Sequence, residues 1–462
     1  MVLAEVNAKN DPKHVVMFVL NDFRPDYRVL KEAMTLSTLG HHVRIFALTG
    51  RKESFDQAYG NVVVTRTSSR LRRVFNTVYG TTVKLPFRIA RILFRLTALP
   101  YTIPRKLGHH FNLIDLPALR PPESFTPMPA TAVVQRKGIL GTVVAYAHSF
   151  GHLGSIIMLY ISWFLENRNV KGDVYHAHDL NTLPIAWFLS RKHGAKLVYD
   201  SHELYTELSF RTPFEKLVWQ MVEKRLIPLA DRVITVNDSI GEELVRRYQI
   251  TLPEVLYNCP PLANPPRGAQ KFHTALGICS TEKIVLYQGG YSPNRGLEEL
   301  ICAFSQVRVG VLVMMGWGGI ERKLISLAKD RQLDGRVYFL PPVPQEQLLE
   351  WTSCADVGVI PYKPVSLNNL YSCPNKLFEY IGAGISIAAS NSPELKRFVA
   401  GQNLGQLFDP NDPSSIAETL NSMLSDENRL ETYKKNSLGS RTQMCWEGES
   451  VKLVRLYQNM SI

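Results

Sequence analysis

The chain has 462 residues, of which 45% are apolar and 20% are charged, and it carries a formal net charge of +12. The length predicts two domains, and the composition is ordinary for a globular protein with a buried core. The sequence contains no repeat period and no low-complexity tract, which excludes a solenoid or a repeat array.

All six cysteines lie in the second half of the chain, and none belongs to a C-x-x-C pair. We therefore expect reduced thiols of a cytosolic protein, and neither a disulfide framework nor a zinc site. The N-terminal segment has no apolar core flanked by basic residues, so we expect no signal peptide. Together these features predict a cytoplasmic location.

Short apolar runs alternate with helical patterns along the first half of the chain. A loop and a helix to about Leu39 follow the first run, and the predicted strands lie at 14–20, 40–48, 173–179, 196–203 and 231–238. Strands that turn polar at their C-terminal ends are typical of a parallel, doubly wound sheet, which binds ligands at that edge. The polar residues at these ends are His176, His178, Asp179, Asp200, His202 and Glu203.

A basic segment interrupts this pattern, because no acidic residue occurs between Asp56 and Asp115. Apolar residues recur there at helical spacing, while Arg88, Arg91 and Arg95 share another face. This pattern is typical of an amphipathic helix on an anionic membrane surface, although a solvated helix face is the alternative. No nucleic-acid reading motif accompanies the charge, so we expect no nucleic-acid partner.

The stretch 138–165 contains no Asp, Glu, Lys or Arg and is long enough to span a bilayer. Histidines and glycines interrupt it, so we expect a buried or membrane-dipping helix instead of a spanning one.

The proline-rich stretch 255–270 predicts a linker, with a domain boundary near residue 265. A second series of predicted strands follows, with a final amphipathic helix at about 447–458, and these strands lie at 283–290, 309–319, 336–343, 355–362 and 386–390. We therefore expect a domain at 1–265 with an insertion at about 66–150, a second domain at 266–445, and a terminal helical segment at 446–462.

Two glycine-rich turns follow strands of the second domain. Gly289 and Gly290 precede Arg295 at the start of a predicted helix, and Gly316 follows the next strand. Glycine admits a ligand close to the backbone, and a helix N-terminus with a guanidinium attracts phosphate. Neither turn matches the dinucleotide fingerprint or a Walker loop, and a glycine after a strand is often only a turn.

The stretch SCPNKLFEYIGAG, residues 372–384, places a lysine and a glutamate at the start of a predicted helix. Lys376 adds positive charge to the positive end of the helix dipole, so an anion at this point would be favourable. Glu379, one turn later, can accept two hydrogen bonds from a vicinal diol such as a ribose. The alternative is a surface ion pair that contributes a few tenths of a kcal/mol.

The sequences HAHD, YDSHELYTE, YQGGYSPNRG and PNKLFEYIGAG occur in this order, and together they resemble the retaining glycosyltransferases of family 4. The resemblance covers nearly the whole chain except the basic insertion. It implies the GT-B fold, with two Rossmann-like α/β domains facing across a cleft. It also implies a nucleotide-sugar bound by the C-terminal domain and a last helix that packs back on the N-terminal domain.

The resemblance assigns Glu379 to the nucleotide ribose, Arg295 to the diphosphate and His178 to the donor sugar, with Gly289 admitting the nucleotide. We group Gly290, Gly316 and Asn375 with the donor site, and Arg28, His202 and Glu203 with the acceptor side. Two departures stand out. Tyr371 replaces the glutamate that usually touches the donor sugar, and Gly290 replaces an arginine. We hypothesise that Lys376 supplies the missing cation.

These features predict a cytoplasmic, peripheral membrane hexosyltransferase of the retaining type, acting in surface polysaccharide or glycolipid synthesis. It would transfer a sugar from a UDP- or GDP-sugar to a saccharide or lipid-linked acceptor. No D-x-D sequence occurs, so we expect no metal, and we expect no cofactor. The alternatives are an epimerase or a phosphorylase of the same fold, and a catalytically inactive homologue that acts as an assembly partner at the membrane.

Overall fold

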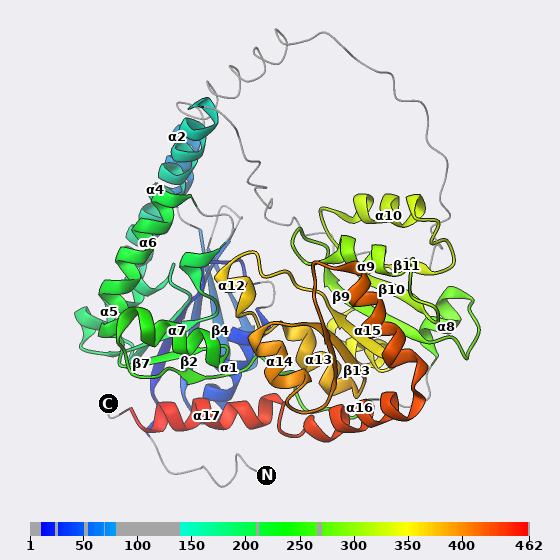
Figure 1. Cartoon of the computed structure of the whole chain (residues 1–462). Coiled ribbons are helices and arrows are strands. Elements are labelled where there is room, and N and C mark those ends of the chain that lie inside the picture. Colours follow the sequence, from blue (N-terminus) through cyan, green and yellow to red (C-terminus); the bar gives the residue numbers. More distant parts are fainter. Residues whose placement is uncertain are drawn as a thin grey trace.

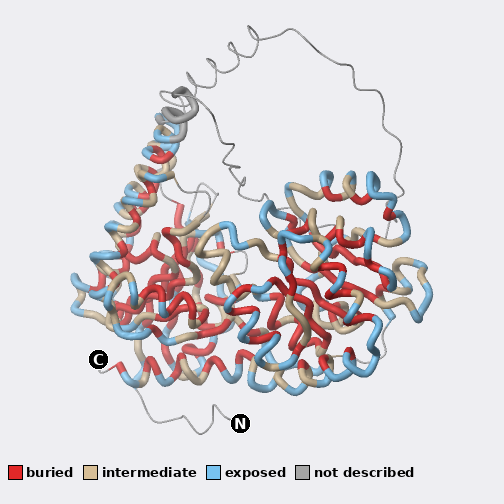
Figure 2. Tube along the Cα trace, in the orientation of Figure 1, coloured by how far each residue is buried: buried red, intermediate tan, exposed pale blue. Residues whose placement is uncertain are grey.

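The computed structural model describes residues 11–23, 26–49, 54–68, 70–79, 139–208, 212–265 and 270–460. Its strands form two separate sheets, and helices cover both sheets (Figure 1). Buried residues follow the strands of each sheet, so each sheet has its own core (Figure 2).

The N-terminal sheet has the strand order β3-β4-β2-β1-β5-β6-β7-β8. Its strands pair in parallel except for β3 and β4, which are antiparallel. The strands are β1 (His14–Phe18), β2 (His42–Leu48), β3 (Phe55–Tyr59), β4 (Val62–Thr67), β5 (Val174–His178), β6 (Lys196–Ser201), β7 (Arg232–Thr235) and β8 (Glu254–Val255).

The C-terminal sheet has the order β11-β10-β9-β12-β13-β14, and its pairs are parallel. The strands are β9 (Ile284–Gly290), β10 (Val311–Trp317), β11 (Val337–Leu340), β12 (Val357–Ile360), β13 (Ser386–Ser390) and β14 (Gly405–Phe408). Both sheets confirm the predicted doubly wound α/β class, because helices connect most of the parallel neighbours.

The helices fall into two groups that follow the two sheets. Those of the N-terminal unit are α1 (Tyr27–Thr38), α2 (Arg70–Tyr79), α4 (Ile139–Asn167), α5 (Leu183–His193), α6 (Pro213–Leu226) and α7 (Asp238–Tyr248), with the short turns η3 (Tyr205–Glu207) and η4 (Ile227–Leu229). The later helices are α8 (Lys271–Leu276), α9 (Leu297–Ala303), α10 (Glu321–Asp330), α11 (Gln345–Thr352), α12 (Leu367–Leu370), α13 (Asn375–Ala383), α14 (Pro393–Val399), α15 (Pro413–Ser425), α16 (Glu427–Ser440) and α17 (Trp446–Gln458).

Strands β3, β4, β8 and β14 were not predicted from the sequence. Strand β3 has the sequence FDQAY and no buried residue, so it lacks the apolar alternation that marks a half-buried strand. Strand β4 contains Arg66, which is buried and donates to the carbonyl oxygens of Asp22 and Phe23. Arg66 is therefore part of the sheet, although the sequence suggested that it begins the basic insertion.

Helix α17 crosses from the C-terminal unit to the N-terminal unit (Figure 1). Its residues Trp446, Leu453, Leu456 and Tyr457 join the core formed by β1, β2 and α1. The indole Nε1 of Trp446 donates to Thr35 Oγ1 at 3.0 Å. The end of the chain thus ties the two units together.

Helix α4 occupies the stretch for which a buried or membrane-dipping helix was expected. Ile156, Leu159 and Trp163 pack into the core of the N-terminal unit. Among the described residues, no helix is long and apolar enough to cross a membrane. The predicted amphipathic face of Arg88, Arg91 and Arg95 lies outside the described residues.

Candidate functional site

A cavity of about 510 Å³ opens where the carboxyl ends of the two sheets face each other. The N-terminal unit contributes His202, Glu203 and Asn237 to its wall, from the loops after β6 and β7. The loops and helices after β9, β10, β11 and β12 form the opposite wall. Parallel α/β sheets place their ligands at this edge, so the cavity is the candidate site.

Two cationic side chains lie in the C-terminal wall. Lys376, in the first turn of α13, is 6% exposed, and its Nζ lies 3.7 Å from the ring centroid of Tyr287. The guanidinium of Arg295 stands 4.0 Å from the ring centroid of Tyr362, and Lys376 Nζ lies 5.1 Å from the same ring. Aromatic faces stabilise both cations, and both residues line the cavity.

Lys376 Nζ has no hydrogen-bond partner within the described residues. Burial, with a smaller contribution from Arg295, lowers its pKa well below the usual value for lysine. A buried ammonium without a partner is unfavourable, and a bound anion would remove that penalty. The pair of cations therefore fits a phosphate or diphosphate group.

The glycines predicted for the donor site differ in what they do. Gly289 lines the cavity with φ at +118°, and a Cβ there would lie 3.5 Å from Lys376 Nζ. Gly316 is a packing residue, because a Cβ on it would lie 2.0 Å from the carbonyl oxygen of Gly289. Gly290 is exposed at the end of β9, outside the cavity wall, and has room for a side chain.

Glu379 lies in the same wall, one turn after Lys376 on α13. Gln288 Nε2 donates to Glu379 Oε2 at 2.5 Å, and Thr352 Oγ1 donates to Gln288 Oε1 at 2.8 Å. Burial raises the pKa of Glu379, while Gln288 and Lys376 oppose that shift. Thr352 fixes the amide of Gln288, which in turn orients a carboxylate toward the cavity.

Asn375 also lines the cavity and connects it to the segment between the two sheets. Its Oδ1 accepts a hydrogen bond from Asn258 Nδ2 at 3.1 Å. Lys31 Nζ of α1 donates to Asn258 Oδ1 at 2.8 Å. These contacts join α1 to the start of α13.

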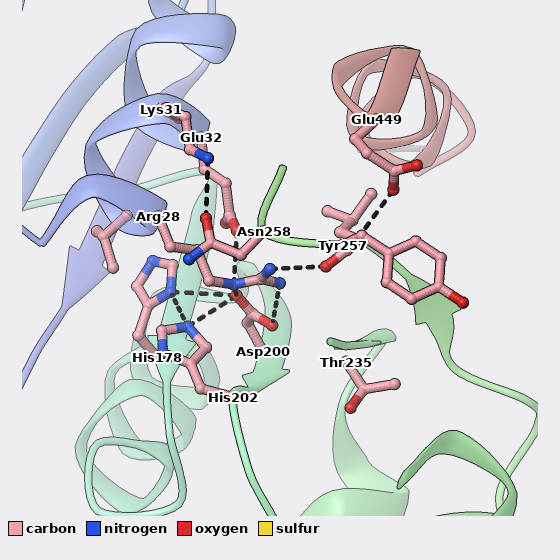
Figure 3. Close-up of polar contacts among 12 residues, drawn as sticks. Arg28, Lys31, Glu32, His178, Asp200, His202, Thr235, Tyr257, Asn258 and Glu449 are labelled. Carbon is pink, nitrogen blue, oxygen red and sulfur yellow. Dashed lines mark hydrogen bonds and ion pairs between the residues drawn. The ribbon is translucent and has the colours of Figure 1, made fainter. Parts of the chain in front are cut away.

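Behind the N-terminal wall lies a buried network centred on Asp200 (Figure 3). Arg28 donates to Asp200 through Nε at 3.0 Å and Nη2 at 2.9 Å, and through Nη1 to the carbonyl oxygen of Leu256. His202 Nε2 lies 3.0 Å from Asp200 Oδ2 and 3.2 Å from His178 Nδ1. Burial opposes ionisation of Asp200, but Arg28 and His202 outweigh it and hold its pKa well below the usual range.

The structure therefore places the predicted N-terminal site residues in two layers. His202 and Glu203 line the cavity, whereas His178 is 2% exposed and lies behind His202. Arg28, which the sequence assigned to the acceptor side, is 4% exposed and lies outside the cavity wall. Arg28 and His178 orient the residues that face the cavity.

Four side chains of this network have the composition of a metal site. The ligand atoms of Glu32, His176, His178 and Asp200 all lie within 4.8 Å of one another. The sequence alone does not indicate this cluster, because Glu32 and Asp200 come from other elements than the two histidines. The guanidinium of Arg28, paired with Asp200 and 3.2 Å from Glu32 Oε1, already supplies a cation here. We therefore read the cluster as an internal ion-pair network.

This network predicts a loss of stability as the pH rises from acidic values to about 8. Burial, with a contribution from Asp200, raises the pKa of Glu32 to about 8. The folded state then keeps a proton that the unfolded chain loses near pH 4.5, so the free energy of unfolding falls as the pH rises from there to about 8. Replacing Glu32 by glutamine, which is neutral at all pH values, should flatten this fall by an amount on the order of 1 kcal/mol or more.

Denaturant unfolding of the wild type and of Glu32→Gln at several pH values measures how the free energy of unfolding of each protein depends on pH. Burial opposes the charged form of His202, but Asp179 and Asp200 outweigh it and raise the pKa of His202 to about 10. His202 therefore adds its own fall in stability between its unfolded pKa and pH 10, which the Glu32→Gln variant keeps. Parallel pH profiles of wild type and variant below pH 8 would contradict the assignment.

Helix α12 bridges the cavity from the C-terminal unit to the N-terminal unit. The backbone N–H of Leu204 donates to Asn368 Oδ1 at 2.9 Å, and Asn237 Nδ2 donates to the carbonyl oxygen of Tyr371 at 2.8 Å. Tyr371 packs against the core of the N-terminal unit. Tyr371, which replaces the expected sugar-contacting glutamate, thus contributes to the contact between the two units.

Sequence reasoning missed several residues of the wall. Gln288, Tyr362 and Asn368 all line the cavity. Gln288 had a readable signal, because it is a polar residue inside the buried strand β9. Tyr362 and Asn368 had none, since Tyr362 lies in the loop after β12 and Asn368 in the short helix α12, and the positions of both depend on the fold.

Two parallel α/β units with a ligand cavity between their carboxyl ends define the GT-B class of glycosyltransferase folds. The model of "Glycosyl transferases group 1" matches residues 269–439, and that of "Glycosyltransferase Family 4" matches residues 104–262. Together the two models match more than half of the chain. The chain therefore belongs to glycosyltransferase family 4, as the sequence motifs predicted.

The similarity to individual proteins is distant. A D-inositol 3-phosphate glycosyltransferase from Thermobispora bispora is 23% identical over 260 residues, covering 51% of this chain and 57% of the relative. The chain spans about half the length of the curated relatives that it matches.

Two solved structures share the whole fold. Sucrose-phosphate synthase from Thermosynechococcus elongatus has a TM-score of 0.66 at 17% identity, covering 97% of this chain and 99% of that one. HepE from Anabaena, in complex with UDP and glucose, has a TM-score of 0.60 at 13% identity, covering 97% and 100%. At these identities the likeness concerns the fold alone.

Proposed function

We propose that the chain transfers a sugar from a UDP- or GDP-sugar to a saccharide or lipid-linked acceptor. The observation that carries this proposal is the set of Lys376, Arg295 and Glu379 in one wall of the cavity. Two cations match a diphosphate, and a half-buried carboxylate within one helical turn matches a ribose diol. A related fold binds UDP and glucose in HepE, which supports this class of donor.

The proposed chemistry needs charge stabilisation more than proton transfer. As the bond between the sugar and the nucleotide diphosphate breaks, negative charge grows on the departing phosphate. Arg295 and Lys376 are positioned to stabilise that charge without rearrangement. In a retaining transfer without metal, the acceptor hydroxyl attacks from the same side and passes its proton to the phosphate oxygen.

His202 and Glu203 stand on the opposite wall, where an acceptor hydroxyl or the donor sugar would lie. Because the pKa of His202 is raised to about 10, its imidazole is charged at neutral pH and donates hydrogen bonds. It would therefore bind hydroxyl or phosphate oxygens and would not act as a base. We assign the acceptor to surface polysaccharide or glycolipid synthesis at the cytoplasmic face of a membrane.

Calorimetric titration with UDP, GDP and their sugars tests the proposal. We expect binding that is selective for one base, and turnover of one of its sugars when an acceptor is present. Conversion of the donor without an acceptor would instead indicate an epimerase. Equal, weak binding of all nucleotides would overturn the proposal and would favour the inactive assembly partner, for which the placement of Tyr371 is the structural argument.

A further inference from the structure

An apolar groove of about 590 Å³ lies on the N-terminal unit, and it shares no wall residue with the nucleotide cavity. Helices α4, α5 and α6 form its walls, and they lie along the outer edge of the N-terminal unit (Figure 1). The apolar side chains that line it include Ile161, Phe164, Trp187, Phe188, Val218 and Met221.

The groove continues an exposed apolar stripe along α4. Phe150, Ile157, Ile161 and Leu165 are 57%, 52%, 40% and 49% exposed, respectively. The last three are spaced by four residues, so they lie on one face of the helix. A helix that is apolar on all sides is normally covered on all sides, but among the described side chains of α4 one face packs into the core while Ile157, Ile161 and Leu165 stay exposed. Its other side is a surface that needs a partner.

Basic side chains stand at the rim of this groove. Arg225 lines it, and Lys192 Nζ lies 5.1 Å from the ring centroid of Phe164 in its wall. Arg191 and Lys224 are also exposed on α5 and α6, whereas Glu166 is the acidic side chain that α4 exposes in its described part. An apolar floor with a cationic rim is complementary to an anionic amphiphile.

The polar groups of the lining are few and partly used. The hydroxyl of Tyr160 already donates to the carbonyl oxygen of Asn181 at 2.6 Å. Arg225 is the charged side chain that lines the wall. An extended peptide would leave its backbone N–H and C=O groups unpaired against such a wall. A hydrocarbon chain has no such groups, so its burial carries no such penalty.

We propose that this groove binds an acyl chain of an anionic lipid in a bilayer, with the lipid phosphate at Lys192 and Arg225. The inference rests on the proposed action at a membrane, and it gives that membrane contact a site in the described structure. Neutralising one rim cation should lower vesicle binding about fivefold. Placing charge in the apolar floor should lower it at least about tenfold.

Flotation with vesicles of phosphatidylcholine, with and without phosphatidylglycerol, tests the site. We expect the full chain to float with the anionic vesicles, and both an Ile161→Glu/Phe188→Glu variant and a Lys192→Gln/Arg225→Gln variant to float less. Leu252→Glu and Val309→Glu are matched controls, because these apolar residues are 68% and 52% exposed outside the groove. Both controls should float like the wild type.

Lipids brominated along the acyl chain add a readout that surface adsorption would not give. They should quench the emission of Trp187, and a Trp187→Phe variant should lose that part of the quenching. Loss of flotation only in an Arg88→Gln/Arg91→Gln/Arg95→Gln variant would overturn the proposal and assign lipid binding to the basic segment. A second outcome would overturn it in favour of self-association. In that outcome the wild type is a dimer that does not bind vesicles, and the Ile161→Glu/Phe188→Glu variant is a monomer.

Nucleotide titration of the same groove variants separates this inference from the proposed function. Variants that lose vesicle binding should keep the nucleotide affinity of the wild type, because the groove and the cavity share no lining residue. Vesicle binding that the groove variants lose, without any nucleotide selectivity, would support the lipid site and overturn the proposed transferase activity. Nucleotide selectivity, with flotation that the groove variants leave unchanged, would support the transferase activity and overturn the lipid site.

Discussion

Replacing Lys376 by methionine is expected to weaken donor use and to stabilise the unliganded protein at the same time. The two effects have one cause, which is the burial of an ammonium group without a hydrogen-bond partner among the described residues. In the free protein the buried amine is a cost, and in the proposed complex its ammonium form pairs with the diphosphate. We expect kcat/KM for the donor to fall about a hundredfold or more.

The stability effect has the opposite sign. Methionine keeps most of the volume of lysine and packs against the rings of Tyr287 and Tyr362 without any charge to desolvate. We expect the free energy of unfolding to rise on the order of 1 kcal/mol or more, since methionine removes the cost of burying the amine, which is paid either as a desolvated charge or as loss of its proton. Thermal unfolding without ligand measures this change.

A matched control is Lys363→Met, also in the C-terminal unit. Lys363 Nζ donates to Glu299 Oε1 at 2.5 Å and lies outside the cavity wall. This variant should lose some stability and keep its donor kinetics. Unchanged donor KM and kcat in Lys376→Met would show that Lys376 is not the second phosphate cation.

Binding of the nucleotide should also be accompanied by proton uptake. The pKa of Lys376 is lowered well below its usual value in the free protein, and a diphosphate next to the amine would raise it again. Titration in buffers of different ionisation enthalpy measures the number of protons taken up. The uptake should disappear in Lys376→Met, and its persistence there would assign it to another group.

Part of the fold follows directly from local patterns in the sequence. The strands β1, β5, β9 and β10 are short runs rich in apolar residues, so their positions and the parallel α/β class were predictable. Gly289 and Lys376 are 87 positions apart in the sequence. The motif order placed them in one domain, but only the fold shows a Cβ at Gly289 meeting Lys376 Nζ.

The predicted cavity positions of Arg28 and His178 were wrong, because these positions depend on contacts between elements that are distant in the sequence. Arg28 and His178 are polar residues in or next to predicted ligand-binding loops, so the sequence treated them as cavity residues. In the structure they lie behind His202, because Asp200 draws both toward the interior. Local patterns show which residues are polar, but they do not show which layer of a site each residue occupies.

The exchange of Glu379 for glutamine is expected to abolish the distinction between ribose and deoxyribose. An ionised carboxylate can accept hydrogen bonds from both hydroxyls of the ribose diol. Glutamine has one acceptor oxygen, which Gln288 Nε2 occupies, and it offers the hydroxyls only an uncharged N–H donor. Hydrogen bonds to charged groups contribute about 1.5–3 kcal/mol, which is roughly a 10- to 150-fold preference in affinity. The variant should bind the nucleotide and its 2′-deoxy form almost equally.

The structure suggests that this change is tolerated. The glutamine oxygen can still accept the hydrogen bond that Gln288 Nε2 gives to Glu379 Oε2. Thr352→Val removes the hydroxyl that fixes the Gln288 amide, so it should reduce the same preference by a smaller factor. Thr352 acts through Gln288 and Glu379, which makes it a positioning residue.

Calorimetric titration with both nucleotide forms, at the base that the wild type selects, measures the ratio of affinities. Glu394→Gln is the control, because Glu394 is also a buried carboxylate but accepts hydrogen bonds from Ser239 outside the cavity wall. It should change stability and leave the ratio intact.

The same preference should depend on pH. Burial raises the pKa of Glu379, so protonation begins at a higher pH than for an exposed glutamate. As the pH falls through that pKa, the preference for ribose should decline in the wild type and stay constant in Glu379→Gln. A wild-type ratio that keeps its value as Glu379 is protonated, or a Glu379→Gln ratio equal to that of the wild type, would remove Glu379 from the ribose site.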